Sequence, residues 1–128
     1  MIVFLDIAEV LKIHDSQIEL FGGEDGIRDV ALLESAVAMP QAGFGMEYLH
    51  KDIYEMAAAY LFHIVKNHPF IDGNKRTGAA SALVFLATNG ILINSDQDEF
   101  EQMVLDAAKG SFQKLETAAY FRERKTFL

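Results

Sequence analysis

The segment "HPFIDGNKRTG", residues His68–Gly78, joins two stretches of helical periodicity and combines residue types that a packed core does not require. A histidine, a phenylalanine and an aspartate alternate, and a glycine, an amide and two adjacent cations follow. One helix is expected from Asp52, its N-cap, to about Lys66, and the next from Asn74 to about residue 89. The segment is therefore predicted to be a short loop that leads into the start of a helix.

The start of this second helix has the features of an anion site. The first backbone N–H groups of a helix lack partners within it and lie at the positive end of its dipole. Gly73 permits close approach of the backbone to a ligand. Arg76 can bind phosphate oxygens in a bidentate way, and Lys75 adds a point charge. Residues Gly73, Asn74, Lys75 and Arg76 thus predict a phosphate site.

Two residues beside this predicted phosphate site suggest that the bound phosphate takes part in a reaction. Asp72 would repel a phosphate directly, but Mg²⁺ binds carboxylates and phosphate oxygens together. His68 has a side chain whose ordinary pKa of about 6.5 suits a general base near neutral pH. A base, a metal carboxylate and a phosphate cradle are the parts of a phosphoryl or nucleotidyl transferase. The structural alternative is a simple Asp72–Gly73 turn, with Asn74 as a cap and a solvated helix start.

The composition limits the class of protein. The 128 residues fit one domain over positions 1–128, and the 51% hydrophobic content is enough for a core. The absence of cysteine excludes disulfides and thiolate metal sites. A net charge of −8 argues against general binding of nucleic acid or anionic membrane. No secretory signal or membrane span is expected, since the longest apolar stretch covers only residues 78–87, and a cytoplasmic location is predicted.

The remaining pattern predicts an all-α fold of about six helices. Asp6 and Glu9 form a capping box for a first helix that stops at residues 22–23, and Asp29 caps the next, which Pro40 follows. Residues 41–50 have no period and are predicted to be a loop, mobile or facing substrate. The sequence "ILIN", residues 91–94, could be a short extended piece.

Two further helices are predicted near the end of the chain. Ser95 is expected to cap the first and Gly110 to end it, and Ser111 is expected to cap the last. The basic end of that last helix suits the negative pole of its dipole and contains Arg122, Arg124 and Lys125.

Several conspicuous residues have structural interpretations. His14 falls on the apolar stripe of the first helix and is predicted to be a satisfied core or interface histidine. His63 is predicted to be a packed helix residue, and Phe70 an anchor that holds the loop to the core. Arg28 and Asp29 are interpreted as a cap with a local ion pair.

The same loop resembles the signature of the Fic/Doc family, and specifically of its death-on-curing (Doc) toxin branch. The wider Fic pattern is H-x-F-x-[DE]-G-N-G-R-x-x-R. It is matched by His68, Phe70, Asp72, Gly73, Asn74 and Arg76. Lys75 replaces a glycine of the adenylyl-transferring branch, and Ala79 replaces its second arginine. A lysine followed by "RT" is typical of the Doc branch, and residues 13–41 and 82–91 resemble it as well.

The resemblance implies the compact all-α Fic core, ATP and Mg²⁺ as cofactors, and a transfer reaction. Most Fic proteins transfer AMP from ATP to a hydroxyl of a target protein. Doc toxins place the nucleotide in the reversed sense and act as kinases on a threonine of elongation factor Tu, which stops translation. In these terms His68 would be the base, Asp72 the Mg²⁺ ligand, and residues 73–76 the phosphate site. A cognate antitoxin, whose C-terminal segment folds onto the toxin, is the implied partner; neither membrane nor direct nucleic-acid binding is expected.

Two other functions stay open at this point. The loop could support AMP transfer, or the protein could arrest growth by binding a target without catalysis. Lys75 adds charge within the cradle, and Ala79 removes a clamp on the triphosphate, which modestly favours the kinase. The inhibitory pattern of many Fic proteins, [ST]-x-x-x-E-[GN], begins correctly at Ser95 but fails at Phe100. Inhibition by a separate partner is therefore expected.

Overall fold

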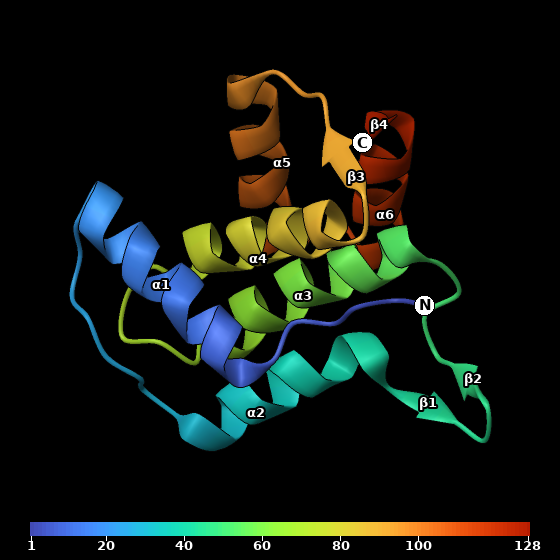
Figure 1. Cartoon of the computed structure of the whole chain (residues 1–128). Helices are drawn as coiled ribbons and strands as arrows, with labels where there is room; N and C mark the ends of the chain where they lie inside the picture. Colours follow the sequence, from blue (N-terminus) through green and yellow to red (C-terminus); the bar gives the residue numbers. More distant parts are fainter.

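Two helices, α3 (Ile53–Asn67) and α4 (Asn74–Thr88), lie side by side at the centre of the structure (Figure 1). The computed structural model describes all 128 residues, and the predicted all-α class with six α-helices is confirmed. Around the central pair are α1 (Ile7–Phe21), α2 (Val30–Ala38), the 3₁₀-helix η1 (Met39–Gln41), α5 (Gln97–Lys109) and α6 (Lys114–Glu123). The strands are short: β1 (Gly43–Phe44), β2 (Glu47–Tyr48), β3 (Ile91–Ile93) and β4 (Lys125–Phe127).

Small residues let the backbones of α3 and α4 approach each other closely. Ala57, Ala58 and Ala59 of α3 are fully buried. A Cβ added at Gly78 of α4 would lie 3.1 Å from the carbonyl oxygen of Leu61, which is tighter than ordinary packing. Helix α4 is therefore buried and closely packed against α3, and the loop between the two helices is attached to a rigid support.

The predicted caps of the first three long helices are confirmed. The Asp6 side chain accepts from the Glu9 N–H at 2.8 Å, and the Glu9 side chain accepts from the Asp6 N–H at 3.1 Å. Asp29 and Asp52 each accept from the N–H three residues later. These contacts satisfy backbone donors that a helix start leaves free. The boundaries of α1, α2 and α3 are therefore set by local sequence.

The predicted caps of α5 and α6 are wrong by one and two residues. Asp96, not Ser95, accepts from the Glu99 N–H at 3.1 Å, because the Ser95 hydroxyl is engaged with the Tyr120 hydroxyl instead. The Ser111 N–H donates to the carbonyl of Asp106 in the closing turn of α5. Helix α6 consequently starts after Gln113.

Three boundaries differ in the extended segments. Residues 41–50, predicted to be a loop, contain the hairpin β1–β2, which turns at Gly45 with φ +65°. Pro40 follows α2, as predicted, but it lies within η1, a short 3₁₀-helix that the sequence did not predict. Lys125, predicted in the last helix, pairs in β4 with Ile93 of β3, which confirms the extended piece at residues 91–94. No helix of the chain has both the length and the apolar character needed to cross a bilayer.

Candidate functional site

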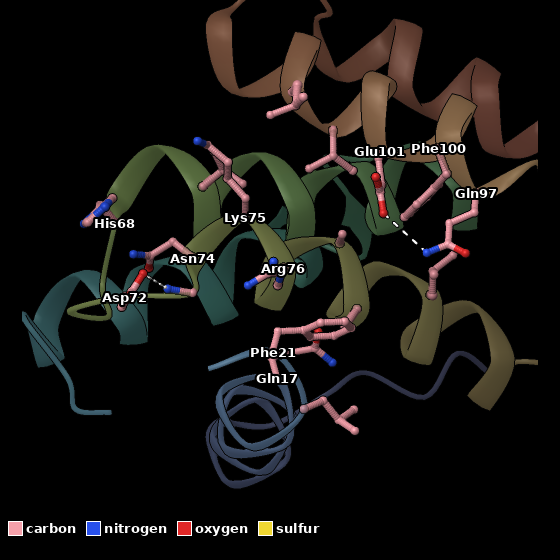
Figure 2. Close-up of a pocket in the computed structure, with 18 residues that line it drawn as sticks. Gln17, Phe21, His68, Asp72, Asn74, Lys75, Arg76, Gln97, Phe100 and Glu101 are labelled. Atoms are coloured by element: carbon pink, nitrogen blue, oxygen red, sulfur yellow. Dashed lines mark hydrogen bonds between the residues drawn. The ribbon is translucent and has the colours of Figure 1, made fainter. Parts of the chain in front are cut away.

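A cavity of about 760 Å³ opens beside the loop between α3 and α4 (Figure 2). Its walls come from α1, from the end of α3, from the first turns of α4 and from α5. The lining includes every residue that the sequence assigned to the site: His68, Asp72, Gly73, Asn74, Lys75 and Arg76. Its volume falls within the range typical of small-molecule sites, about 300–1,000 Å³.

Phe70 anchors the loop to the core, as predicted. Its side chain is fully buried and stacks on the His14 ring, with centroids 3.8 Å apart and planes within 6°. His14 is itself buried, and its Nε2 lies 2.8 Å from the carbonyl oxygen of Asp72. The interpretation of His14 as a satisfied core residue is therefore confirmed for this nitrogen.

Asn74 contributes to the cavity in a way that its sequence position does not reveal. Its side chain is buried and bridges the backbone of Phe70, accepting from the N–H and donating to the C=O at 3.0 Å each. The amide is therefore occupied within the loop. What Asn74 offers to a ligand is its backbone N–H, which precedes the first α4 hydrogen bond, from Thr77 to Gly73.

The segment before α2 forms hydrogen bonds that hold the loop between α3 and α4 in place. The N–H groups of Arg28 and Asp29 donate to the carbonyl of Pro69, at 2.7 and 3.0 Å. The Arg28 guanidinium donates to the carbonyls of His68, at 2.6 Å, and Asn67, at 2.9 Å. The predicted Arg28–Asp29 ion pair is wrong, because the cation instead binds the last carbonyls of α3, where the helix dipole favours positive charge.

His68 lies at the C-cap of α3 with its side chain exposed at the cavity. Its backbone is left-handed, with φ 51° and ψ 53°, and it is the one non-glycine residue of the chain with positive φ. The Arg28 contact to its carbonyl fixes this conformation. The imidazole is thus presented at the mouth of the site from a well-held backbone.

The Asp72 carboxylate is exposed and held in the charged form. It accepts from the Gly73 N–H at 2.8 Å and from the Glu24 N–H at 3.2 Å. These two backbone donors, with a smaller contribution from Arg76, keep the pKa of Asp72 below its usual value. Each carboxylate oxygen keeps a further lone pair. Mg²⁺ binds one or two protein carboxylates together with phosphate oxygens. The ionised Asp72 carboxylate, beside the predicted phosphate site at the start of α4, is therefore a suitable ligand for Mg²⁺.

Lys75 and Arg76 have no acidic partner within ion-pair distance. The Arg76 guanidinium instead lies over the Phe21 ring, 4.6 Å from its centroid. Unpaired cations at the positive pole of a helix are unfavourable in isolation, and a bound anion would satisfy both them and the free N–H groups. By contrast, Arg122 and Arg124 near the C-terminus pair with acids.

The sequence identified six of the 18 residues that line the cavity, and Phe21 and Glu101 are among those it did not identify. Phe21 supports Arg76 from the end of α1, and its one signal is an exposed aromatic ring just before a glycine stop. Glu101 of α5 lines the opposite wall and accepts from Gln97 at 3.4 Å (Figure 2). His63 lies outside the cavity lining, where burial and nearby Lys114 lower its pKa to about 4. That confirms His63 as a packed helix residue.

Comparisons with known proteins find a family model and two relatives that match this chain. The model of the Fic/DOC family matches residues 4–86, which include the whole loop. The chain is 35% identical over 102 residues to "Protein kinase doc" of Escherichia phage P1, across 80% of this chain and 79% of that protein. It is 44% identical over 79 residues to "Toxin Doc" of Mycolicibacterium smegmatis, across 61% of this chain and 60% of that relative.

Proposed function

This chain belongs to the Fic/DOC family, and from that premise we propose that it is the toxin of a toxin–antitoxin pair and acts as a protein kinase. The family and the names of its relatives support a transferase. The observation that carries the proposal is the pair of unpaired cations, Lys75 and Arg76, at a helix start inside a cavity that also holds His68 and Asp72.

The proposed reaction moves the terminal phosphoryl group of ATP to a Ser or Thr hydroxyl. The hydroxyl oxygen attacks the γ-phosphorus, the bond from that phosphorus to the β–γ bridging oxygen breaks, and ADP leaves. The His68 imidazole takes the hydroxyl proton. Asp72 would hold Mg²⁺, which would neutralise phosphate charge.

The start of α4 would stabilise the transition state. Its charge spreads over the equatorial oxygens of the phosphoryl group, so preorganised donors are effective there. The free N–H groups of residues 74–76 and the side chains of Lys75 and Arg76 are such donors. Phe21 limits the orientations of the Arg76 guanidinium by stacking on it.

Target and partner follow from the Doc branch of the family. We propose elongation factor Tu as the phosphorylated protein and a cognate antitoxin as the inhibitor, with residues 1–128 acting as a single Fic/Doc-like domain. The names of the two relatives, a kinase and a toxin, support the kinase and toxin parts of this proposal, and the target rests on the resemblance to the Doc branch. AMP transfer by the same cavity is the competing reaction, and the next experiment separates the two.

Protein incubated with a cell extract is expected to transfer label from [γ-³²P]ATP and not from [α-³²P]ATP. Lys75→Ala should lower that transfer on the order of 10²-fold, because it removes a charge that stabilises the phosphoryl group. Lys12→Ala, an exposed lysine on α1, is the matched control and should leave the rate unchanged. Transfer from the α-position alone would establish AMP transfer instead, and no transfer with persistent growth arrest would indicate a binding protein.

Asp72→Asn is expected to raise the Mg²⁺ concentration needed for half-maximal transfer by about tenfold or more, with a lower maximal rate. Asparagine keeps one acceptor oxygen, which can still accept from the Gly73 N–H, and loses the contact with the Glu24 N–H, so circular dichroism and thermal unfolding should accompany the titration. The measurement is a Mg²⁺ titration of transfer at saturating ATP, with Asp98→Asn, an exposed aspartate of α5, as control. An unchanged Mg²⁺ dependence would exclude Asp72 as the ligand.

A further inference from the structure

The tautomer of His14 is fixed by its surroundings. Its Nε2 lies 2.8 Å from the carbonyl oxygen of Asp72, and a carbonyl can only accept a hydrogen bond. Nε2 therefore carries a hydrogen. In the neutral ring this leaves a lone pair on Nδ1, the other nitrogen. The ring cannot turn away, because the side chain is 2% exposed and stacks on Phe70.

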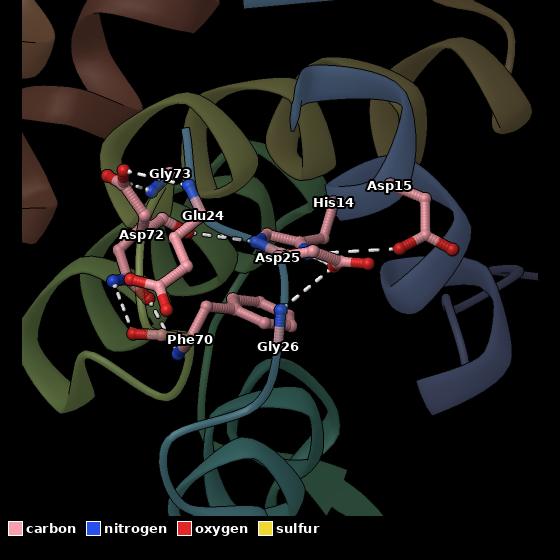
Figure 3. A network of polar contacts seen from close by, with 9 residues as sticks. His14, Asp15, Glu24, Asp25, Gly26, Phe70, Asp72 and Gly73 are labelled. Atoms are coloured by element: carbon pink, nitrogen blue, oxygen red, sulfur yellow. Dashed lines mark hydrogen bonds and ion pairs between the residues drawn. The ribbon is translucent and has the colours of Figure 1, made fainter. Parts of the chain in front are cut away.

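Nδ1 points at two carboxylates and makes no hydrogen bond. Asp25 Oδ1 lies 3.7 Å from it and Asp15 Oδ1 lies 4.0 Å from it, both too far for a hydrogen bond (Figure 3). Asp25 Oδ1 also accepts from the Gly26 N–H at 2.9 Å, which offsets part of its charge. A lone pair facing two negative oxygens is repulsive unless a proton or a metal ion lies between them.

We propose that His14 Nδ1, Asp15 and Asp25 bind a divalent transition-metal ion of the zinc class. The three ligand atoms lie within 4.8 Å of one another. A tetrahedral ion with bonds of about 2.1 Å would place them roughly 3.4 Å apart, so closing the site shortens the separations between ligand atoms by about 0.3 to 1.4 Å. The two carboxylates are exposed and free to make that movement.

The donor set selects the class of ion. Imidazole nitrogen with carboxylate oxygen suits Zn²⁺, whereas Mg²⁺ takes oxygen ligands and water. Metal-binding histidines almost always donate their other ring N–H to a carbonyl or carboxylate, as His14 does to Asp72. Three protein ligands leave one position of a tetrahedral ion for water.

This site is separate from the proposed Mg²⁺ site, although the two are connected. Asp72 takes part through its backbone carbonyl and not through its carboxylate. An ion between Asp15 and Asp25 would fix α1 to the segment that follows it. That segment holds the catalytic loop through the contact of the Glu24 N–H with Asp72. The proposed ion would therefore brace the loop from the side opposite the cavity.

The test is a calorimetric titration of the untagged full chain with Zn²⁺, without nucleotide. Wild type should bind one equivalent, and Asp15→Asn and Asp25→Asn should each bind about tenfold more weakly or worse. Glu19→Gln removes one exposed acid from the same helix and should bind as wild type does. Asp72→Asn keeps its carbonyl and should also retain the ion, which separates this site from the active site.

Side-chain NMR gives the second readout. In ¹⁵N-labelled protein, Zn²⁺ should shift the Nδ1 resonance of His14 while its Nε2 stays protonated. In Asp25→Asn the Nδ1 shift should require a Zn²⁺ concentration at least about tenfold higher, with circular dichroism confirming the fold. The proposal is overturned if wild type shows no saturable binding, if Asp25→Asn binds as tightly as Glu19→Gln, or if His14 Nδ1 is unaffected at saturation.

Discussion

Replacing His68 by alanine is expected to lower the rate of phosphate transfer by about 10²–10⁴-fold, the range for loss of a general base. The side chain is exposed at the cavity and makes no contact that holds the fold. Alanine also carries a Cβ, so the left-handed backbone at this position is no more strained than before. Single-turnover transfer from [γ-³²P]ATP measures the loss directly.

The control separates chemistry from folding. His63→Gln changes a half-buried histidine that does not line the cavity, and transfer should stay near the wild-type rate. Thermal unfolding of both variants should show that His68→Ala remains folded. A folded His68→Ala protein with a near-normal rate would remove this residue from the mechanism.

Phe70→Ala is expected to lower the free energy of unfolding by about 3–5 kcal/mol, the usual cost of removing a buried phenylalanine side chain. Its ring is fully buried and stacked on His14, and its backbone is bridged by Asn74. For a domain whose total stability is about 5–15 kcal/mol, this is a large fraction. Urea unfolding followed by circular dichroism gives the value.

Phe44→Ala is the matched control, because that ring is 94% exposed in the β1–β2 hairpin. Its effect should stay within about 0.5 kcal/mol. If Phe70→Ala does not fold at all, Phe70→Leu keeps much of the buried volume and should show a smaller loss of the same sign. A change below about 1 kcal/mol for Phe70→Ala would contradict its role as the anchor.

The helix boundaries show which features of the fold are local. Asp6, Asp29 and Asp52 cap their helices through contacts only three residues long, so the pattern alone predicts them. Ser95 and Asp96 are both good caps, and the choice between them depends on Tyr120, which is 25 residues away. The hairpin at residues 43–48 has strands of two residues, too short for any alternation to be visible.

The residues of the cavity also divide into those that nearby sequence reveals and those that depend on contacts between distant parts of the chain. His68, Asp72, Lys75 and Arg76 could be grouped from the sequence because they lie close together in the chain, on both sides of one helix start. The position of the Arg28 side chain could not, because its acceptors are carbonyls 39 and 40 residues away. Likewise Phe21 comes from another helix, and its relation to Arg76 exists only after α1 packs beside α4.

The backbone of His68 is left-handed, so the residue type that would give the most stable fold at this position is glycine. The residue type that the proposed reaction needs there is histidine. Glycine accepts that conformation freely, whereas other residues lose about 1–2 kcal/mol there. A lineage released from selection for transfer would gain stability by exchanging this histidine for glycine. If His68 is the base, as proposed, His68→Gly should therefore give a protein that is more stable and less active than the wild type.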